Sequence, residues 1–137
     1  MSTNSPAARV LAPIKLRTQV AAGFRVDEFD LAHPGTSWAA PFEMSLFCIE
    51  AGSESVPESH EDAELWLVAA GVGLMSHGEQ VLELRPGCVV SIDPGIVHKV
   101  MNTGSTALQV FSVWWSGNTH SCEAGGTLEV AQQITNP

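Results

Sequence analysis

Two stretches of the chain decide the fold: GSESVPESHEDAELWLVAAG at residues 52–71 and GCVVSIDPGIVHKVMN at residues 87–102. In both, short runs rich in Val, Leu and Ile stand between glycines and turn-forming residues, such as the DPG of residues 93–95. Such runs are typical of β-strands bounded by turns and are too short for stable helices. Both stretches therefore predict β-structure.

The same pattern continues outward in both directions. Turn signals such as HPGTS, AGSES, SHGEQ and NTGST interrupt β-favouring runs about every eight to twelve residues. No stretch has a convincing helical period, so the expected fold class is all-β, a sandwich or a barrel. We predict strands at 9–11, 14–19, 24–31, 42–50, 64–70, 72–76, 80–84, 89–92, 97–102 and 107–115.

Length and composition indicate a single domain. The chain has 137 residues, of which 45% are hydrophobic and 15% charged, and it contains neither an internal repeat nor a domain linker. A chain of this length can bury a core without disulfides as staples. We expect a flexible N-terminus at 1–8, a β-barrel at 9–116, and a C-terminal tail at 117–137 that packs on the barrel or trails from it.

Charge and cysteine content limit the partners and the compartment. A formal net charge of −9 disfavours binding to nucleic acid and to anionic membrane surfaces. The three cysteines, Cys48, Cys88 and Cys122, form no C-x-x-C pair, and no apolar run approaches the length of about 18 residues that spans a membrane. We expect a reduced, cytoplasmic protein. Its many Ala and Val residues and few Lys are typical of a bacterial chain.

Four side chains in the two stretches predict a metal site. Glu58 and His60 are two residues apart and project together from an extended chain, and Glu64 shares their parity if the strand is only briefly interrupted. His98 follows the DPG turn on a separate strand. Imidazoles and carboxylates that converge in this way suit a divalent ion, and iron(II), manganese, nickel and zinc all match the ligand type. Asp62 could replace Glu64 as the carboxylate.

These stretches resemble the two motifs of the cupin family, G-x5-H-x-H-x3-E-x6-G and G-x5-P-x-G-x2-H-x3-N. The first maps onto residues 52–71 and the second onto residues 87–102 with every spacing kept. The resemblance implies a cupin-type double-stranded β-helix, or jelly-roll, barrel with one metal ion held by His60, Glu64 and His98. Asp93 departs from the second motif, where the family has Pro, and Pro94 follows at once.

Glu58 is the more important departure, because the family places its first histidine ligand there. With Glu58 as a ligand, the site has two histidines and two carboxylates and is formally neutral around a divalent ion. Without it, His60, Glu64 and His98 form the two-histidine, one-carboxylate triad that suits non-heme iron(II) and dioxygen. Glu58 is therefore predicted either as a fourth ligand or as a catalytic base.

Three functions follow from this site. The first is an iron(II) dioxygenase that oxidises a small amino-acid-, thiol- or phenol-like metabolite without 2-oxoglutarate. The second is a redox-neutral isomerase, lyase or cyclase in which zinc, nickel or manganese polarises a carbonyl and Glu58 moves a proton. The third is a non-catalytic barrel that binds small molecules.

The remaining predictions concern the pocket, the other polar residues and the assembly. We expect Trp66, Phe47, Met101 and Arg25 to contact the substrate. Cys48 and Cys88 are predicted as small buried hydrophobes. Several strands are apolar on both faces, which implies a covering layer, and cupins commonly pair, so we expect a homodimer. The other three histidines are predicted to be exposed to solvent: His33, His77 and His120.

Overall fold

A computed structural model describes residues 8–31 and 38–116, with residues 13–18 described by their backbone. These residues form β-strands and no helix, which confirms the all-β prediction, and they contain no helix that could cross a membrane. The predicted tail at 117–137, most of the predicted flexible N-terminus, His33, His120 and Cys122 lie outside the described residues. The strands are β1 (Pro13–Ala21), β2 (Phe24–Phe29), β3 (Glu43–Ile49), β4 (Ala63–Ala70), β5 (Gly73–His77), β6 (Gln80–Leu84), β7 (Val89–Ile92), β8 (His98–Asn102) and β9 (Leu108–Trp115).

One predicted strand, at 9–11, is wrong. β1 begins at Pro13, which pairs with Phe29 at the end of β2. Residues 9–11 therefore run past the end of β2 and pair with no other described segment, although their sequence favours an extended chain. The other predicted strands are present, with ends that differ from the prediction by a few residues at most.

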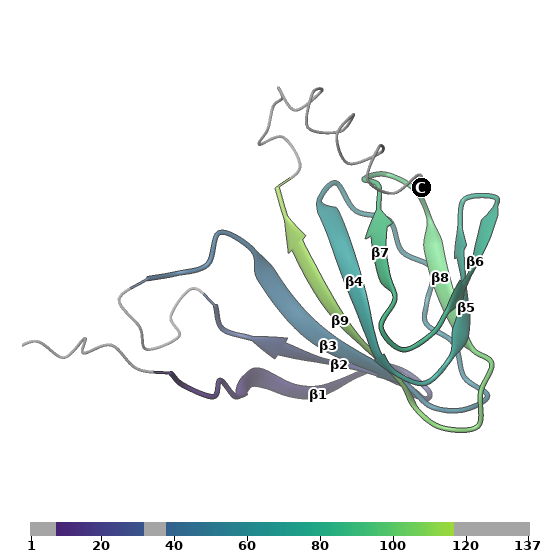
Figure 1. Cartoon of the computed structure of the whole chain (residues 1–137), viewed down its shortest axis with the longest axis horizontal. Helices are drawn as coiled ribbons and strands as arrows, with labels where there is room; N and C mark the ends of the chain where they lie inside the picture. Colours follow the sequence, from purple (N-terminus) through teal and green to yellow (C-terminus); the bar gives the residue numbers. More distant parts are fainter. Residues whose placement is uncertain (1–7, 32–37, 117–137) are drawn as a thin grey trace, which may run out of the picture.

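The strands form two antiparallel sheets that face each other (Figure 1). The larger has the order β1-β2-β3-β9-β4-β7 and the smaller the order β6-β5-β8. The segment at 53–58 lies along the free edge of β8, because Ser55 N donates to Val100 O and Asn102 N donates to Ser53 O. This arrangement is the predicted jelly-roll barrel, and it brings the segment before β4 beside the start of β8.

Strand parity separates the core from the outer surface. On β4, Glu64, Trp66 and Val68 are buried, whereas Leu65 and Leu67 between them are exposed. Each large apolar side chain buried in this way stabilises the fold by about 1.5–3 kcal/mol. The core between the sheets consists of Phe24, Phe47, Ile49, Trp66, Val68, Met75, Leu84, Ile92, Val100, Leu108 and Val110.

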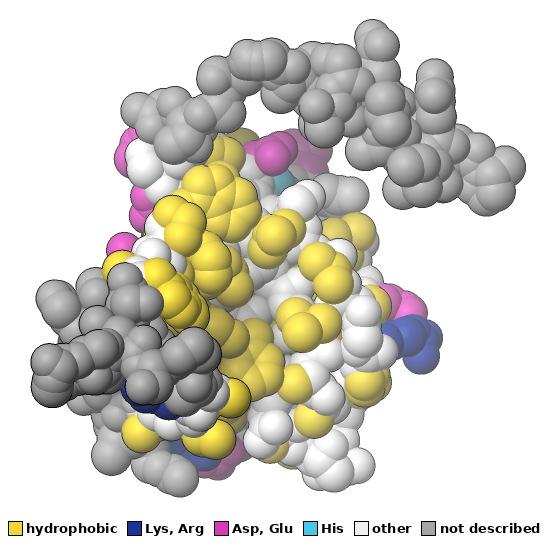
Figure 2. Space-filling view, turned by 60° about the vertical axis from the view of Figure 1, so that its left-hand side comes forward, with side chains coloured by type: hydrophobic (Ala, Val, Ile, Leu, Met, Phe, Trp, Pro, Cys, Tyr) yellow, Lys and Arg dark blue, Asp and Glu magenta, His cyan; other side chains and the backbone are white. Residues whose placement is uncertain are grey.

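The outer face of the larger sheet also carries hydrophobic side chains. Cross-strand pairing places Val113 opposite Met44 and Leu65, so these residues share a face. The next row pairs Phe111 with Leu46 and Leu67. Hydrophobic side chains gather over the face that Figure 2 shows. The sequence-based expectation of strands that are apolar on both faces is thus met in β3, β9 and β4.

Two glycines, one from each motif, make tight turns. Gly71 follows the last residue of β4 with a φ of +86°, and a Cβ placed on it would lie 2.5 Å from Ala107 O. Gly95 has a φ of +81° in the turn that leads into β8. L-residues with a side chain rarely adopt this left-handed region, which explains glycine at both positions.

Candidate metal centre

A cavity of about 360 Å³ opens between the two sheets, at the end of the barrel where β8 begins. Its wall is partly apolar, with Phe24, Val26, Phe47 and Trp114 from the larger sheet. Its polar side brings together residues from β4, β8 and the segment before β4, namely Glu58, His60, Asp62, Glu64 and His98. Side chains predicted from distant parts of the sequence therefore meet in one place.

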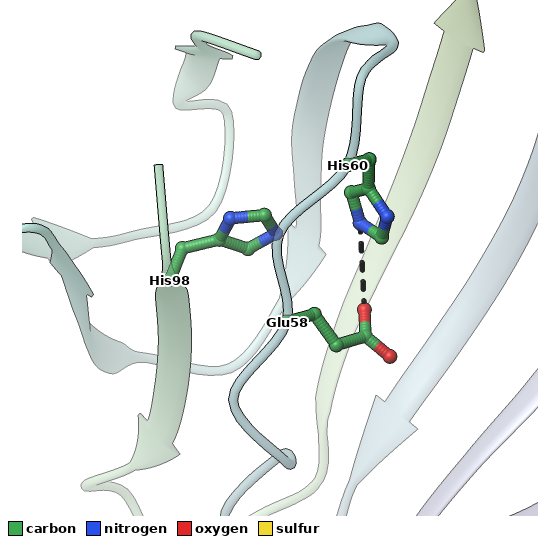
Figure 3. Close-up of side chains that lie close together, drawn as sticks. All are labelled: Glu58, His60 and His98. Carbon is green, nitrogen blue, oxygen red and sulfur yellow. Dashed lines mark ion pairs between the residues drawn. The ribbon is translucent and has the colours of Figure 1, made fainter. Parts of the chain in front are cut away.

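Glu58, His60 and His98 form a compact group of donor atoms (Figure 3). One donor atom from each lies within 4.8 Å of the other two, and Oε1 of Glu58 is 3.5 Å from Nε2 of His60. Backbone hydrogen bonds hold the group, because Glu58 N donates to His98 O and His98 N donates to Glu58 O. This pairing fixes the segment before β4 against the first residue of β8.

The ring of His98 is fixed in orientation. His98 is 4% exposed, and its Nδ1 lies 3.0 Å from the carbonyl oxygen of Ile96. A carbonyl can only accept, so this contact assigns the ring proton to Nδ1 and leaves the lone pair of Nε2 directed at the other donors. The turn before His98 is also tied to the site, because Gly95 N donates to His60 O over 2.6 Å.

Glu64 has one oxygen satisfied by protein donors and one that is not. Its Oε2 accepts hydrogen bonds from Trp66 Nε1 and from Ser112 Oγ. Its Oε1 is buried without a hydrogen-bond partner among the described residues, 3.8 Å from His60 Nε2 and 3.9 Å from His98 Nε2. A buried carboxylate oxygen without a partner is costly unless a cation lies beside it.

These donors fit a divalent ion. Two atoms that each bind a shared ion at about 2.1 Å lie at most about 4.2 Å apart. The separations of 3.5, 3.8 and 3.9 Å between carboxylate oxygens and imidazole nitrogens lie within that limit. The mixed nitrogen and oxygen donor set suits iron(II), manganese, nickel or zinc.

Comparison with protein families identifies the family of this chain. The cupin domain profile matches residues 45–114, about half of the chain, and this range includes both motifs and all four candidate ligands. The chain belongs to the cupin family.

One curated relative matches only part of this cupin. It is 29% identical over 73 residues to the xanthan biosynthesis protein XanB of Xanthomonas campestris pv. campestris, a match that covers 53% of this chain and 16% of that protein. The chain therefore spans about a sixth of that relative's length.

Solved structures share the fold at low identity. A Cupin 2 conserved barrel domain protein from Salinispora arenicola is 24% identical with a TM-score of 0.65, covering 83% of this chain and 92% of that one. A predicted oxalate decarboxylase from Thermotoga maritima is 18% identical with a TM-score of 0.59, covering 77% and 93%. Procruciferin, an 11S globulin from Brassica napus, is 21% identical with a TM-score of 0.70, covering 81% and 32%. These proteins differ in their named roles but share the barrel, so the fold alone does not indicate the chemistry of this chain.

Of the residues predicted to contact substrate, this cupin brings two to the cavity. Phe47 and Trp66 both line it, and their rings meet edge to face with centroids 5.1 Å apart. Asp62, the alternative carboxylate, also lines the cavity, and both it and Glu64 lie outside the group of Glu58, His60 and His98. Only Glu64 of these two has a described contact with the histidines, at 3.8 Å from His60 Nε2 and 3.9 Å from His98 Nε2. The structure thus places Asp62 in the pocket wall beside the candidate ligands.

The structure places the other two, Met101 and Arg25, elsewhere. Met101 is 46% exposed on β8, because its parity is opposite to that of the buried His98 and Val100. Arg25 lies on β2 between Phe24 and Val26, which face the cavity, so its side chain leaves the sheet on the opposite side. Neither residue lines the cavity.

Sequence reasoning also missed two polar residues at the site. His77, predicted to be exposed in a turn, ends β5 opposite His98, and the two rings stack with centroids 6.4 Å apart. Its Nε2 is buried, so the prediction of an exposed His77 is wrong. Ser112 bonds to Glu64 from β9. The sequence feature that could have indicated Ser112 is that it is the single polar residue in the apolar run VFSVWW.

Proposed function

We propose that this cupin holds one divalent metal ion through His60, Glu64 and His98 and acts as an iron(II) dioxygenase on a small metabolite. The observation that carries the proposal is the buried Oε1 of Glu64, which has no hydrogen-bond partner among the described residues and faces two imidazole nitrogens. A fold rarely leaves a buried carboxylate oxygen in this state without a cation to compensate it. The two-histidine, one-carboxylate set is the donor type that leaves positions open on iron(II).

Each protein group then has a defined task. His98, with its proton on Nδ1, offers Nε2, and Trp66 and Ser112 hold Glu64 so that Oε1 faces the histidines. When bound, a ferrous ion would bring the substrate's donor atom and dioxygen together and activate the oxygen. The apolar wall that includes Phe47 would hold the body of the substrate and exclude water.

Glu58 is suited to move a proton. Its side chain is 45% exposed, and its carboxylate faces the cavity 3.5 Å from His60 Nε2. A carboxylate at this position can take the proton of a substrate hydroxyl and pass it to solvent. We therefore assign Glu58 as the base of the reaction.

The absence of a cationic anchor supports a reaction without 2-oxoglutarate. A co-substrate with two carboxylates needs Arg or Lys partners in the pocket. None of the basic side chains that the structure describes lines the cavity.

Elemental analysis of the anaerobically purified protein tests the proposal, together with the Glu58→Ala and His98→Ala variants. We expect nearly one iron per chain, lost in His98→Ala and kept in Glu58→Ala, and oxygen consumption by the iron-loaded protein with a substrate. A protein that takes up no metal even after reconstitution would contradict it and favour a non-catalytic barrel.

One observation favours the redox-neutral alternative. Glu58 belongs to the compact donor group, so Glu58 and Glu64 together would neutralise a divalent ion. A site of this charge suits zinc, nickel or manganese that polarises a carbonyl, with Glu58 as ligand as well as proton carrier. Zinc, nickel or manganese lost in both Glu58→Ala and His98→Ala would support an isomerase, lyase or cyclase in place of the dioxygenase.

A further inference from the structure

The cavity of the candidate metal centre has a strongly one-sided charge distribution. Glu28, Glu58, Asp62 and Glu64 all line it. The carboxylates of Glu58 and Glu64 lie 3.5 and 3.8 Å from His60 Nε2, whereas no such contact with a histidine is found for the described side chain of Asp62. Four carboxylates thus line one small space.

The described basic side chains lie elsewhere. Lys99 forms an ion pair with Glu54 at 2.8 Å, and Arg85 forms one with Glu83 at 2.7 Å. Arg25 leaves β2 on the side away from the cavity. In the part of the chain whose side chains are described, no Lys or Arg side chain lines the cavity.

The charge balance at the site follows directly. Histidines bind a metal in their neutral form, so a divalent ion with the carboxylates of Glu58, Asp62 and Glu64 leaves one net negative charge, and Glu28 of β2 is a further acid in the wall. Apolar walls strengthen such a field, because they keep the effective dielectric constant low. A carboxylate or phosphate that enters the cavity would be repelled, whereas a neutral or cationic molecule would not.

The rest of the wall indicates the body of the ligand. Phe24, Val26, Phe47 and Trp114 form an apolar surface, with the hydroxyl of Ser45 among them. A volume of about 360 Å³ has room for a molecule with one aromatic ring and a short side chain. Such a ring could pack on Phe47 and Trp114 while its hydroxyl reaches Glu58.

We infer that this cavity selects a neutral or cationic molecule of one ring, such as a phenol or a phenolic amine, and rejects carboxylates and phosphate esters. Asp62 contributes to this charge preference, because it adds a negative charge beyond the metal ligands and lies only two residues from His60; Glu28 on β2 is the other acid of the wall outside the ligand set. The inference rests on the proposed function, since it assumes that the substrate binds beside the metal. It narrows the amino-acid-, thiol- and phenol-like classes to molecules without a free carboxylate.

Three ligands with one skeleton test the inference: 4-ethylphenol, tyramine and 4-hydroxyphenylacetate. Binding to the zinc-loaded full chain is followed by the fluorescence of Trp66 and Trp114, which line the cavity, and by calorimetry. We expect 4-ethylphenol and tyramine to bind about tenfold or more tightly than the carboxylate. Equal or tighter binding of 4-hydroxyphenylacetate would overturn the inference, and so would failure of all three to bind.

Two matched variants test whether Asp62 contributes to the weaker binding of the carboxylate. Asp62→Asn should narrow the gap between tyramine and 4-hydroxyphenylacetate severalfold. Glu61→Gln removes the same charge from the exposed neighbouring residue, which does not line the cavity, and should leave the gap unchanged. Equal effects of the two variants would mean that the overall charge of the protein sets the preference, which contradicts a role for Asp62.

The same series in metal-free protein separates this inference from the proposed function. Removal of a doubly charged cation makes the cavity more negative, so the preference for tyramine over the carboxylate should widen. A protein that never takes up metal but keeps this order would contradict the proposed function and support the charge selection. A protein that binds metal but prefers 4-hydroxyphenylacetate would contradict the charge selection and leave the proposed function standing.

Discussion

The indole Nε1–H of Trp66 donates a 2.8 Å hydrogen bond to Oε2 of Glu64, two residues earlier on the same strand. Both side chains project inward from β4, because residues two apart on a strand share a face. The bond occupies one carboxylate oxygen and leaves the other, Oε1, toward His60 and His98. Trp66 is thus a positioning residue for a candidate ligand as well as part of the cavity wall.

Replacing Trp66 with Phe should weaken metal binding while the ring contact is kept. Loss of a hydrogen bond that orients a ligand costs about 10- to 100-fold in metal affinity. Competition with a chromophoric zinc chelator measures this change. Trp114→Phe is the matched control, since Trp114 lines the same cavity and no hydrogen bond to Glu64 is found for it. Equal losses in both variants would argue against the positioning role.

Metal should stabilise the folded protein through His98. A ligand that binds only the folded state at about 100 times its dissociation constant adds about 2.7 kcal/mol to the free energy of unfolding. Thermal unfolding with and without zinc should therefore show a clear rise in Tm for the parent chain and none for His98→Ala. His77→Ala is the control, because His77 stacks on His98 but lies outside the donor group. A zinc-induced rise retained in His98→Ala would contradict the assigned site.

Gly71→Ala should lower the free energy of unfolding more than Gly87→Ala. Both have positive φ, of 86° and 91°, and share the backbone strain of about 1–2 kcal/mol. At Gly71 the added Cβ would also lie 2.5 Å from Ala107 O and 2.7 Å from Leu108 Cα, whereas nothing lies within 4 Å at Gly87. Denaturant unfolding of both variants measures the difference. Equal losses of stability would show that the turn at Gly71 moves to accept a side chain.

The homodimer expected from the sequence stays a prediction, and the outer face of the larger sheet is where we expect the contact. Leu65 and Leu67 keep 38% and 44% of their surface exposed there, next to Phe111 and Val113 on β9. Burial of such a face gains about 25 cal/mol per Å² of apolar surface. Sedimentation should give twice the 14.5 kDa mass of the chain.

Leu67→Lys should return the chain to its single mass, because it places a charge in the expected contact. Val81→Lys is the control, since Val81 is 63% exposed on β6 in the smaller sheet. A parent chain that is already monomeric would contradict the dimer. A dimer that Leu67→Lys leaves intact would place the contact on another surface.

Much of this protein could be predicted from local sequence. Turn signals and short apolar runs located the strands from β1 to β9, because strand ends depend on nearby glycines, prolines and polar residues. The spacing of the two motifs, together with their resemblance to those of the cupin family, predicted Glu58, His60, Glu64 and His98 as candidate donors, since residues two apart on a strand share a face. The strand predicted at 9–11 failed because a strand needs a partner, and partners are not local.

The face of a strand from which a side chain projects was harder to predict, because it depends on the register between paired strands. Met101 and Arg25 were expected in the pocket, and both occupy the parity that faces away from it. A shift of one residue in the alignment of a strand reverses every side chain on it, so composition alone could not assign the face. His77 was misjudged for a related reason: its sequence context is a turn, yet pairing with β8 places it beside His98.

The sequence by itself determined the fold class and the succession of strands along the chain, because both depend on residues close together in the chain, and the spacing within its two motifs predicted the four candidate ligands. Only the tertiary structure decided how Glu64 is held and what surrounds it. Ser112 reaches Glu64 across 48 positions of sequence, and Glu58 pairs with His98 across a separate sheet edge. Such contacts arise when antiparallel pairing brings distant strands into register, and the free energy that selects this pairing comes from burial of the whole core.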